Sequence, residues 1–285
     1  MFITLGQQRI FFDVVGSKLA PDGPRMREKP TLIVLHGGPG FDHSGLRGDF
    51  DGFADIAQVI YIDHRGNGRS APSDPSTWTL AQWGDDVRAL CDALGIEKPI
   101  VLGQSFGGMV AQSYATRHPE HPRALILSST AARMDFPGSM AIFHKMGGEE
   151  ALAIATRMWE SGRDEEFDAY ERVCMPLYNT QVRAGGMDAR ARVVMRREVY
   201  RHFSLPGGEM RRMDFRDALS KIVCPTLIVA GERDPITPPH LSREMLTSIK
   251  VAPAVLRIYD DCGHGAFRDQ PDVVLPAIRQ FIAGL

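Results

Sequence analysis

The sequence predicts an α/β fold with a mostly parallel central sheet that is flanked by helices on both faces. Two observations carry this prediction: short apolar runs bounded by turn residues recur along the chain, and helical patterns lie between them. Strands that are apolar on both sides are typical of a parallel sheet covered by helices. The predicted strands are Thr31–Leu35, Val59–Ile62, Ile100–Leu102, Ala124–Leu127, Thr226–Ala230 and Val255–Tyr259, and the clearest helices are Leu80–Leu94, Met109–Arg117 and Val273–Ile282.

The N-terminal residues add elements that do not follow this alternation. Phe2–Leu5 and Arg9–Val15 flank a short turn at residues 6–8, which predicts a β-hairpin. The segment Ser17–Lys29 is polar and contains two prolines and a glycine, so we expect a surface loop there.

A long helical segment interrupts the alternation in the second half of the chain. Residues 134–216 show no strand-like run, and their helical pattern is broken only by Gly and Pro. We therefore predict a helical cap, or lid, at 134–216 inserted into a core formed by residues 1–133 and 217–285. Acidic residues predominate in 134–182 and basic residues in 183–216, as expected of solvated faces that attract each other.

Composition excludes several classes of function. The chain has 285 residues, 44% of them hydrophobic and 24% charged, with a formal net charge of −2, so no global charge favours nucleic acid or an anionic membrane. No apolar run approaches the roughly 20 residues of a membrane helix, and the first residues do not resemble a signal peptide. The four cysteines are widely spaced and indicate neither a metal site nor disulfides. We expect a cytoplasmic protein without cofactor or metal; its oligomeric state is not predicted.

One motif points to chemistry. The segment Gly103–Gly108 reads Gly-Gln-Ser-Phe-Gly-Gly, and it lies between a predicted buried strand and a predicted helix. A Gly-x-Ser-x-Gly turn in that context is typical of a nucleophile elbow, in which a strained turn presents the serine hydroxyl at the sheet edge. We therefore predict that Ser105 is a nucleophile.

A serine hydroxyl needs a base to take its proton and a third group to orient that base. Asp234 and His264 both follow predicted strands, and the order Ser, acid, His along the chain suits this fold. His36 and His64 also follow strands and are competing candidates for the base. Asp135, after the strand ending at Leu127, is the rival for the acid, whereas Asp260 and Asp261 lie too close to His264 in sequence.

The same chemistry requires donors for a negatively charged oxygen. The backbone N–H of Phe106, directly after the nucleophile, is one expected donor. The second should come from the glycine-rich loop at residues 36–40, His-Gly-Gly-Pro-Gly, where absent side chains let the backbone approach a substrate.

These motifs together resemble an α/β-hydrolase of the proline iminopeptidase branch, peptidase family S33. The resemblance covers the chain outside the helical segment and implies a catalytic triad of Ser105, Asp234 and His264. It also implies that Gly38 and Phe106 donate the oxyanion-hole N–H groups, and that residues 63–70 form a structural loop braced by Arg65. The motifs are His-Gly-Gly-Pro-Gly at 36–40, Asp-His-Arg-Gly-Asn-Gly-Arg-Ser at 63–70, Gly-Gln-Ser-Phe-Gly-Gly at 103–108, Gly-Glu-Arg-Asp at 231–234 and Gly-His-Gly at 263–265.

The chain departs from the branch at two positions. His64 stands where iminopeptidases tend to have Gln or Met, and Phe106 stands where Trp or Tyr is common. Members of the branch hold the free amino end of a peptide with acidic residues, but no motif selects among the acids of this segment: Glu149, Glu150, Glu160, Glu165, Glu166, Glu171, Glu198 and Glu209.

The first expectation is a serine hydrolase that cleaves an amide or ester through an acyl-enzyme, and the resemblance implies a proline iminopeptidase-like aminopeptidase that releases N-terminal proline or another small residue from a short peptide or small molecule. A carboxylesterase or a lactonase, including one for acyl-homoserine lactones, is the alternative. A non-catalytic small-molecule receptor with a hydrolase fold is the remote one.

Overall fold

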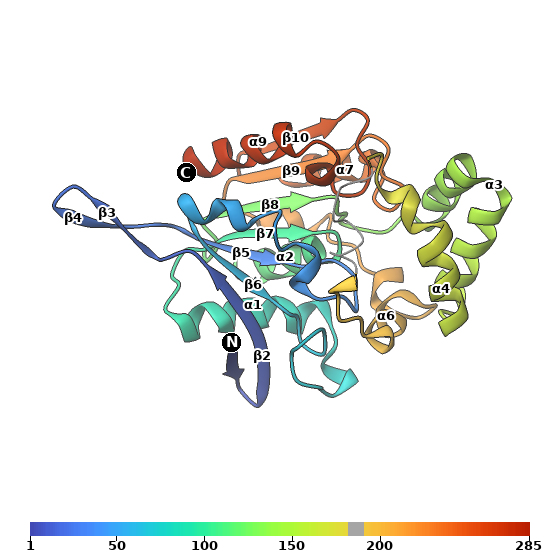
Figure 1. The fold of residues 1–285 in the computed structure, drawn as a ribbon, viewed down its shortest axis with the longest axis horizontal. Helices are drawn as coiled ribbons and strands as arrows, with labels where there is room; N and C mark the ends of the chain where they lie inside the picture. The colour runs from blue at the N-terminus through green and yellow to red at the C-terminus, as the bar shows by residue number, and fades with distance from the viewer. Residues whose placement is uncertain (182–190) are drawn as a thin grey trace.

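The computed structural model describes residues 1–181 and 191–285. Within these residues a central eight-stranded sheet has the order β1-β2-β6-β5-β7-β8-β9-β10, and its strands from β6 onward run parallel (Figure 1). The sheet confirms every predicted parallel strand, most of them longer by a residue or two. Its strands are β1 Phe2–Leu5, β2 Gln8–Val15, β5 Thr31–Leu35, β6 Gln58–Ile62, β7 Ile100–Gln104, β8 Ala124–Ser128, β9 Thr226–Gly231 and β10 Ala254–Tyr259.

The predicted N-terminal hairpin is present, but the predicted loop after it is wrong. Strands β1 and β2 pair antiparallel, and β2 continues antiparallel to β6. Residues 17–29, in contrast, contain a two-stranded ribbon of β3 (Leu19–Asp22) and β4 (Arg25–Glu28), which projects from the sheet in Figure 1. Its polar composition reflects solvent around the ribbon, and Gly23 supplies the positive φ of the turn.

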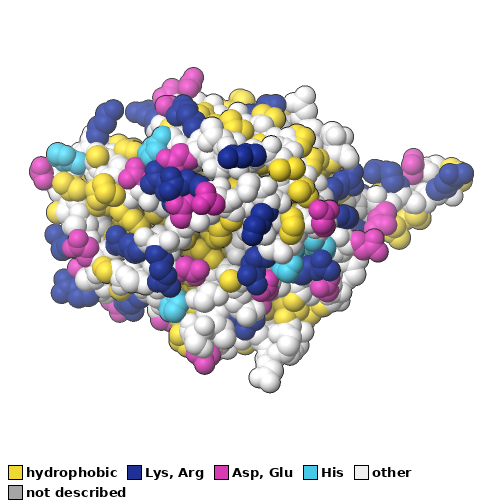
Figure 2. Space-filling model, turned by 180° about the vertical axis from the view of Figure 1, so that it is seen from behind, with side chains coloured by type: hydrophobic (Ala, Val, Ile, Leu, Met, Phe, Trp, Pro, Cys, Tyr) yellow, Lys and Arg dark blue, Asp and Glu magenta, His cyan; other side chains and the backbone are white. Residues whose placement is uncertain are grey.

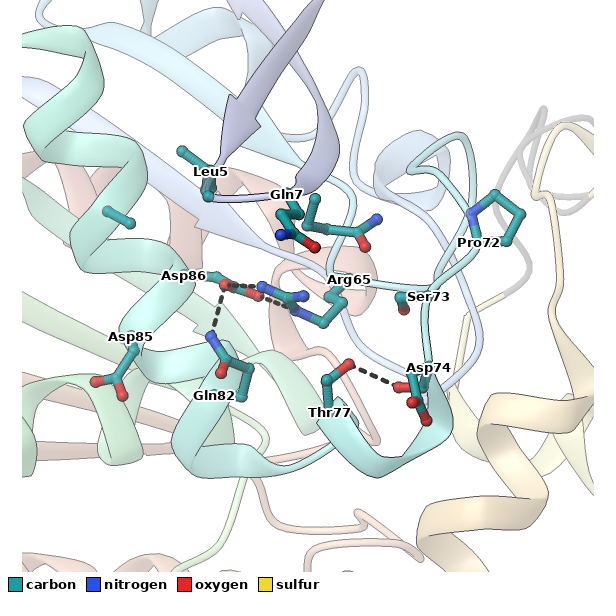
Figure 3. A pocket seen from close by; sticks show the side chains of 13 residues that line it. Leu5, Gln7, Arg65, Pro72, Ser73, Asp74, Thr77, Gln82, Asp85 and Asp86 are labelled. Atoms are coloured by element: carbon teal, nitrogen blue, oxygen red, sulfur yellow. Dashed lines mark hydrogen bonds and ion pairs between the residues drawn. The ribbon is translucent and has the colours of Figure 1, made fainter.

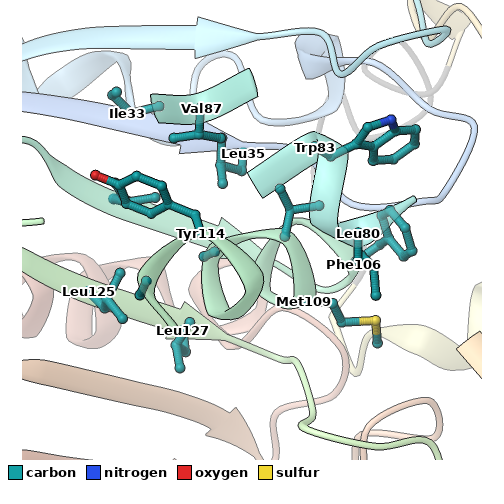
Figure 4. Packing of buried hydrophobic residues seen from close by; sticks show 14 of the residues in the cluster. Ile33, Leu35, Leu80, Trp83, Val87, Phe106, Met109, Tyr114, Leu125 and Leu127 are labelled. Carbon is teal, nitrogen blue, oxygen red and sulfur yellow. The ribbon is translucent and has the colours of Figure 1, made fainter. Parts of the chain in front are cut away.

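Helices cover both faces of the sheet, as predicted. On one face α1 (Leu80–Leu94), α2 (Phe106–Arg117) and α7 (Pro239–Ser248) pack on the strands in one apolar cluster, part of which Figure 4 shows. On the other face α8 (Ala266–Asp269) and α9 (Pro271–Ala283) belong to a second cluster. None of the helices in the described residues has an apolar stretch long enough to cross a membrane.

The described part of residues 134–216 is helical. It contains α3 (Phe136–Glu160), α4 (Asp164–Val173) and α6 (Arg197–Ser204), with short 3-10 turns at Met175–Tyr178 and Glu209–Arg211. Gly148, with φ of 68°, breaks α3 internally. Helices α3 and α4 form a cluster of their own beyond the ends of the parallel strands (Figure 1), built on side chains such as Phe143, Trp159 and Phe167, whereas the buried apolar side chains of α6 belong to the core cluster.

Charged side chains are distributed over the outside of the molecule. On the face seen in Figure 2, Lys and Arg alternate with Asp and Glu, and the projecting ribbon carries both signs. The mixture accords with the near-neutral net charge of −2.

Aromatic packing joins the helical segment to the core directly behind the predicted nucleophile. The Phe203 ring on α6 lies 4.8 Å from the Trp83 ring and 5.0 Å from the Phe106 ring, measured between centroids. All three side chains are fully buried. One apolar contact therefore fixes α6, α1 and the start of α2 relative to one another. Figure 4 shows the Trp83 and Phe106 side chains of this contact.

Replacing Phe203 should weaken the fold because its ring fills this contact. We expect Phe203→Ala to lower the free energy of unfolding by about 3 to 5 kcal/mol, as measured by urea denaturation. The exposed Phe2 serves as control, and Phe2→Ala should change stability by less than about 1 kcal/mol. Equal effects of the two substitutions would contradict this account of the packing.

Candidate active site

Ser105 occupies a strained turn between β7 and α2. Its φ of 55° and ψ of −121° lie in a region that residues with side chains rarely adopt. Flanking glycines permit the turn: a Cβ on Gly103 would lie 2.4 Å from the Gly107 oxygen, and one on Gly107 would lie 2.2 Å from the Leu35 oxygen. The Ser105 N–H donates to the Ser128 carbonyl at 2.9 Å. The turn has the nucleophile-elbow conformation that the motif predicts.

The predicted base and acid are in contact. The Nδ1 of His264 lies 2.9 Å from Asp234 Oδ2 and 3.0 Å from Oδ1, and both side chains are buried. Asp234 is itself held by the backbone N–H groups of Ile236 and Thr237, each 2.8 Å from Oδ1, and by the Thr237 hydroxyl. A carboxylate at Nδ1 requires the proton there, which leaves Nε2 as the acceptor nitrogen.

The rival acids have other partners. Asp135 caps the N-terminus of α3 through Gly138 N–H and lies 3.0 Å from His240 Nε2. Asp261 is exposed and pairs with Arg233. Among the described carboxylates, the one that the structure pairs with His264 is Asp234.

The His264 loop and the Ser105 turn are joined through the end of β8. Gly265 N–H donates to Ser129 Oγ at 2.8 Å, while the neighbouring Ser128 carbonyl accepts from Ser105. The structure assigns no hydrogen bond to the Ser105 hydroxyl from any described residue. Catalytic hydrogen bonds often tighten only when substrate binds, so the absence of this bond leaves His264 a candidate base.

The glycine-rich loop at residues 36–40 reaches the same turn. A Cβ on Gly37 would lie 3.2 Å from Ser105 Cβ and 3.7 Å from its Oγ. Gly38 has φ of 130° and precedes a cis peptide bond to Pro39. The N–H of Gly40 donates to Asn67 Oδ1 at 2.9 Å, which ties this loop to residues 63–70. Backbone rather than side chains therefore faces the nucleophile here.

The two competing histidines are structural. The Nδ1 of His36 lies 2.7 Å from the Gly37 carbonyl, and its Nε2 accepts from His64 N–H at 3.1 Å. Burial lowers the pKa of His36, and burial together with the neighbouring His36 lowers the pKa of His64 well below its ordinary value. The His64 ring also stacks on Trp83 at 5.2 Å. Both imidazoles are neutral parts of the core behind the site.

Arg65 braces its loop, as the resemblance implies. Its guanidinium makes two hydrogen bonds to Asp86 on α1, at 2.8 and 2.6 Å, and both side chains are nearly buried (Figure 3). A hollow of about 600 Å³ lies beside this pair, lined by the β1–β2 turn, residues 72–77 and α1. Ser105, Asp234 and His264 do not line it, so it is not the candidate active site.

The glutamates of the helical segment divide into two groups. Glu166 is buried, but it accepts from Ser161 and from Arg163, and Glu209 accepts from Leu80 N–H at 2.8 Å. The remaining six are exposed: Glu149, Glu150, Glu160, Glu165, Glu171 and Glu198.

Other reactive groups of the described residues do not form a second centre. All four cysteines are free and buried, and burial raises the pKa of Cys91 and Cys174 to about 12 and that of Cys224 and Cys262 to about 11. Their thiols are therefore protonated near neutral pH and weak nucleophiles. Residues 1–181 and 191–285 hold no cluster of three or more His, Cys, Asp or Glu side chains placed to bind a metal.

Comparison with known proteins defines the class. The model of the alpha/beta hydrolase fold family matches residues 30–271, and the chain belongs to that family. Proline iminopeptidase of Lactobacillus helveticus is 30% identical over 279 residues, which span 90% of each protein. Within the family the chain falls in the proline iminopeptidase-like branch, and it is a hydrolase.

Solved structures show the same fold. The crystal structure of proline iminopeptidase from Mycobacterium smegmatis matches with a TM-score of 0.76 at 23% identity, covering 100% of this chain and 97% of that one. A thermophilic esterase from Thermogutta terrifontis matches with a TM-score of 0.71 at 26% identity, covering 99% and 96%. The scaffold therefore occurs in both a peptidase and an esterase.

Sequence reasoning missed two residues beside His264. Tyr178 packs the edge of its ring on the His264 imidazole at 5.3 Å, and Asp269 accepts the Gly263 N–H at 2.7 Å. No motif marks Tyr178. Asp269 could have been chosen from the sequence as a neighbour of the base, because it lies five residues after His264 and shortly before the predicted helix Val273–Ile282.

If Arg65 acts only as a brace, its loss should affect stability rather than substrate binding. Arg65→Ala leaves Asp86 buried without its cation, which should lower the free energy of unfolding by about 3 kcal/mol or more in urea. Arg88→Ala, which breaks the exposed pair with Asp92, should lower it by about 0.5 kcal/mol or less. A raised KM without loss of stability would show that Arg65 contacts substrate.

The buried histidines predict a pH dependence of stability. Their folded-state pKa lies below the unfolded value, so below about pH 6.5 the unfolded chain binds more protons and stability falls as pH falls. Between pH 7.5 and 5.5 His64, whose pKa lies well below its ordinary value, should reduce the free energy of unfolding by about 1 kcal/mol, and His36 should act in the same direction. His64→Gln should reduce this slope, whereas His144→Gln at an exposed position should not. An unchanged slope in His64→Gln would contradict the assignment.

Proposed function

We propose that this chain is a serine hydrolase whose nucleophile is Ser105, base His264 and orienting acid Asp234, working through an acyl-enzyme. The observation that carries the proposal is the buried His264–Asp234 contact at 2.9 Å, at the sheet edge where Ser105 occupies its strained turn. Residues 134–216 act as a helical cap on a core of residues 1–133 and 217–285.

Acylation follows from this arrangement. The Nε2 of His264 takes the proton of Ser105 Oγ as that oxygen bonds to the substrate carbonyl carbon. Negative charge moves to the carbonyl oxygen, where the N–H groups of Phe106 and Gly38 stabilise it. The imidazolium then protonates the leaving nitrogen or oxygen, whose bond to carbon breaks. Asp234 stabilises the imidazolium and fixes the ring orientation throughout.

Deacylation repeats these steps with water. His264 removes a proton from one water molecule, whose oxygen attacks the acyl carbon; collapse of the intermediate returns the proton to Ser105 and releases the acid. Exclusion of bulk water by the cap strengthens each of these electrostatic interactions.

An aminopeptidase that releases N-terminal proline or another small residue is the substrate class we propose. The 30% identity to a proline iminopeptidase over 90% of the chain supports it. An acid-rich first half of the cap is a source of carboxylates for a substrate amine.

Two observations favour an esterase or lactonase as the second candidate. Glu166 and Glu209 are already engaged by protein donors. In addition, apolar and aromatic side chains of the cap pack on both triad loops: the apolar cluster of the cap includes Ile236, two residues after Asp234, and the Tyr178 ring packs on His264.

Asp234→Asn tests the proposed triad. The amide cannot hold the imidazole in the required tautomer and charge state, so kcat for a p-nitrophenyl ester or an aryl-amide should fall by about 10⁴-fold. Circular dichroism should show an intact fold. Asp135→Asn, which removes the rival carboxylate, should retain kcat; a collapse of activity in that variant alone would transfer the role to Asp135.

A substrate whose amino group is blocked distinguishes an aminopeptidase from an esterase or amidase. If cap carboxylates bind a free amine, proline aryl-amide should be cleaved faster than its N-acetylated form, because acetylation removes the positive charge. Steady-state kcat/KM for the pair measures this preference. An equal or higher value for the blocked substrate would favour the esterase or amidase assignment.

A further inference from the structure

The cap is fastened to the loop of the proposed base. The backbone N–H of His264 donates to the Tyr178 carbonyl at 2.6 Å, and Asn179 Nδ2 donates to the His264 carbonyl at 3.3 Å. The Thr180 hydroxyl donates to the Asp261 carbonyl on the same loop. Residues 178–181 therefore run along the loop that carries the imidazole.

A buried carboxylate completes this contact. Asp269 is 8% exposed, and its Oδ1 accepts from Thr180 N–H at 3.0 Å and Gln181 N–H at 3.2 Å. Its Oδ2 accepts from Gly263 N–H at 2.7 Å. Within the described part of the chain, no Lys, Arg or His forms an ion pair with it. Three backbone N–H groups thus hold this buried side chain in place.

The two oxygens of Asp269 face different parts of the protein. One oxygen holds the cap segment at 180–181, and the other holds the N–H of Gly263, the residue before His264. Space at the junction is minimal, because a Cβ on Gly263 would lie 1.9 Å from the Tyr178 carbonyl oxygen. A displacement of residues 178–181 is consequently transmitted to the His264 backbone.

We propose that Asp269 is a positioning residue: it couples residues 178–181 of the cap to His264 and so sets the reach of the imidazole toward Ser105. The proposal rests on the proposed serine-hydrolase function. In this proposal the cap determines where the His264 imidazole lies, in addition to excluding water. Misplacement of a catalytic group by about 1 Å can reduce the rate by about 10²-fold.

The test compares three folded variants in the full chain. The isosteric Asp269→Asn retains one acceptor oxygen, so one side of the contact is lost, and kcat for a p-nitrophenyl ester should fall about 10-fold or more with KM within about twofold. Asn179→Ala, at a half-buried position, should reduce kcat about threefold. Gln270→Ala is the matched control: it breaks only a contact to the Asp260 carbonyl, at 2.8 Å, which does not involve the cap, so kcat should stay within about twofold of wild type.

A second readout is the rate of labelling by a small fluorophosphonate, which needs an active base but little substrate binding. This rate should fall in parallel with kcat in Asp269→Asn and Asn179→Ala. Wild-type labelling and kcat in a folded Asp269→Asn would overturn the proposal. An equal loss in Gln270→Ala would also overturn it, because any disturbance of the loop would then suffice without the cap. If wild type itself were not labelled, the proposed function would fail instead. If Asp269→Asn does not fold, the comparison of Asn179→Ala with Gln270→Ala tests the coupling of the cap to His264.

Discussion

The contact between Asp234 and His264 is the interaction on which the rest of the site depends. Two residues 30 positions apart meet because β9 and β10 end at the same edge of the sheet, and each is followed by a loop. The carboxylate is 1% exposed and has three protein donors besides the imidazole. A buried carboxylate without such partners would be protonated or would destabilise the fold. The loop after β9 is thus built around the Asp234 side chain.

Close backbone packing brings the other parts of the site to this contact. Gly103 and Gly107 let α2 begin against β7 and β5, and Gly231 lets the end of β9 lie against residues 262–263. Gly263 then allows residues 178–179 of the cap to reach the base. At each junction a Cβ would lie within 2.5 Å of another backbone atom. The site is therefore an assembly of backbone segments that pack too closely for side chains, with Ser105, Asp234 and His264 extending from them.

The sequence alone predicts much of the framework because its signals are local. Buried parallel strands are apolar runs, helices have a 3.6-residue period, and the turn at Ser105 needs glycines at fixed positions. The ribbon at 19–28 was missed because both of its sides face solvent, so its strands lack the apolar alternation of a half-buried strand. The Asp22-Gly23 pair, which is typical of a hairpin turn, was the local signal that could have predicted the ribbon.

Contacts between distant segments carry little sequence signal. Glu209 accepts from Leu80 N–H across 129 positions, so nothing local distinguishes it from the six exposed glutamates. Glu166 differs, because its partners Ser161 and Arg163 lie only three to five positions earlier, at the start of α4. The approach of Tyr178 to His264 spans 86 positions, and the contact of Asp269 with Thr180 spans 89. His43 lacked any pattern of its own, yet it is buried with its Nδ1 2.6 Å from Asp63.

The central claim is that the imidazole–carboxylate pair makes one particular hydroxyl reactive. Its most direct test is to treat the native protein with a fluorophosphonate, digest it, and locate the added mass by tandem mass spectrometry. The account predicts a single modification on Ser105, absent in Ser105→Ala and in His264→Ala. Modification at another residue, or a folded native protein that takes up no label, would contradict it.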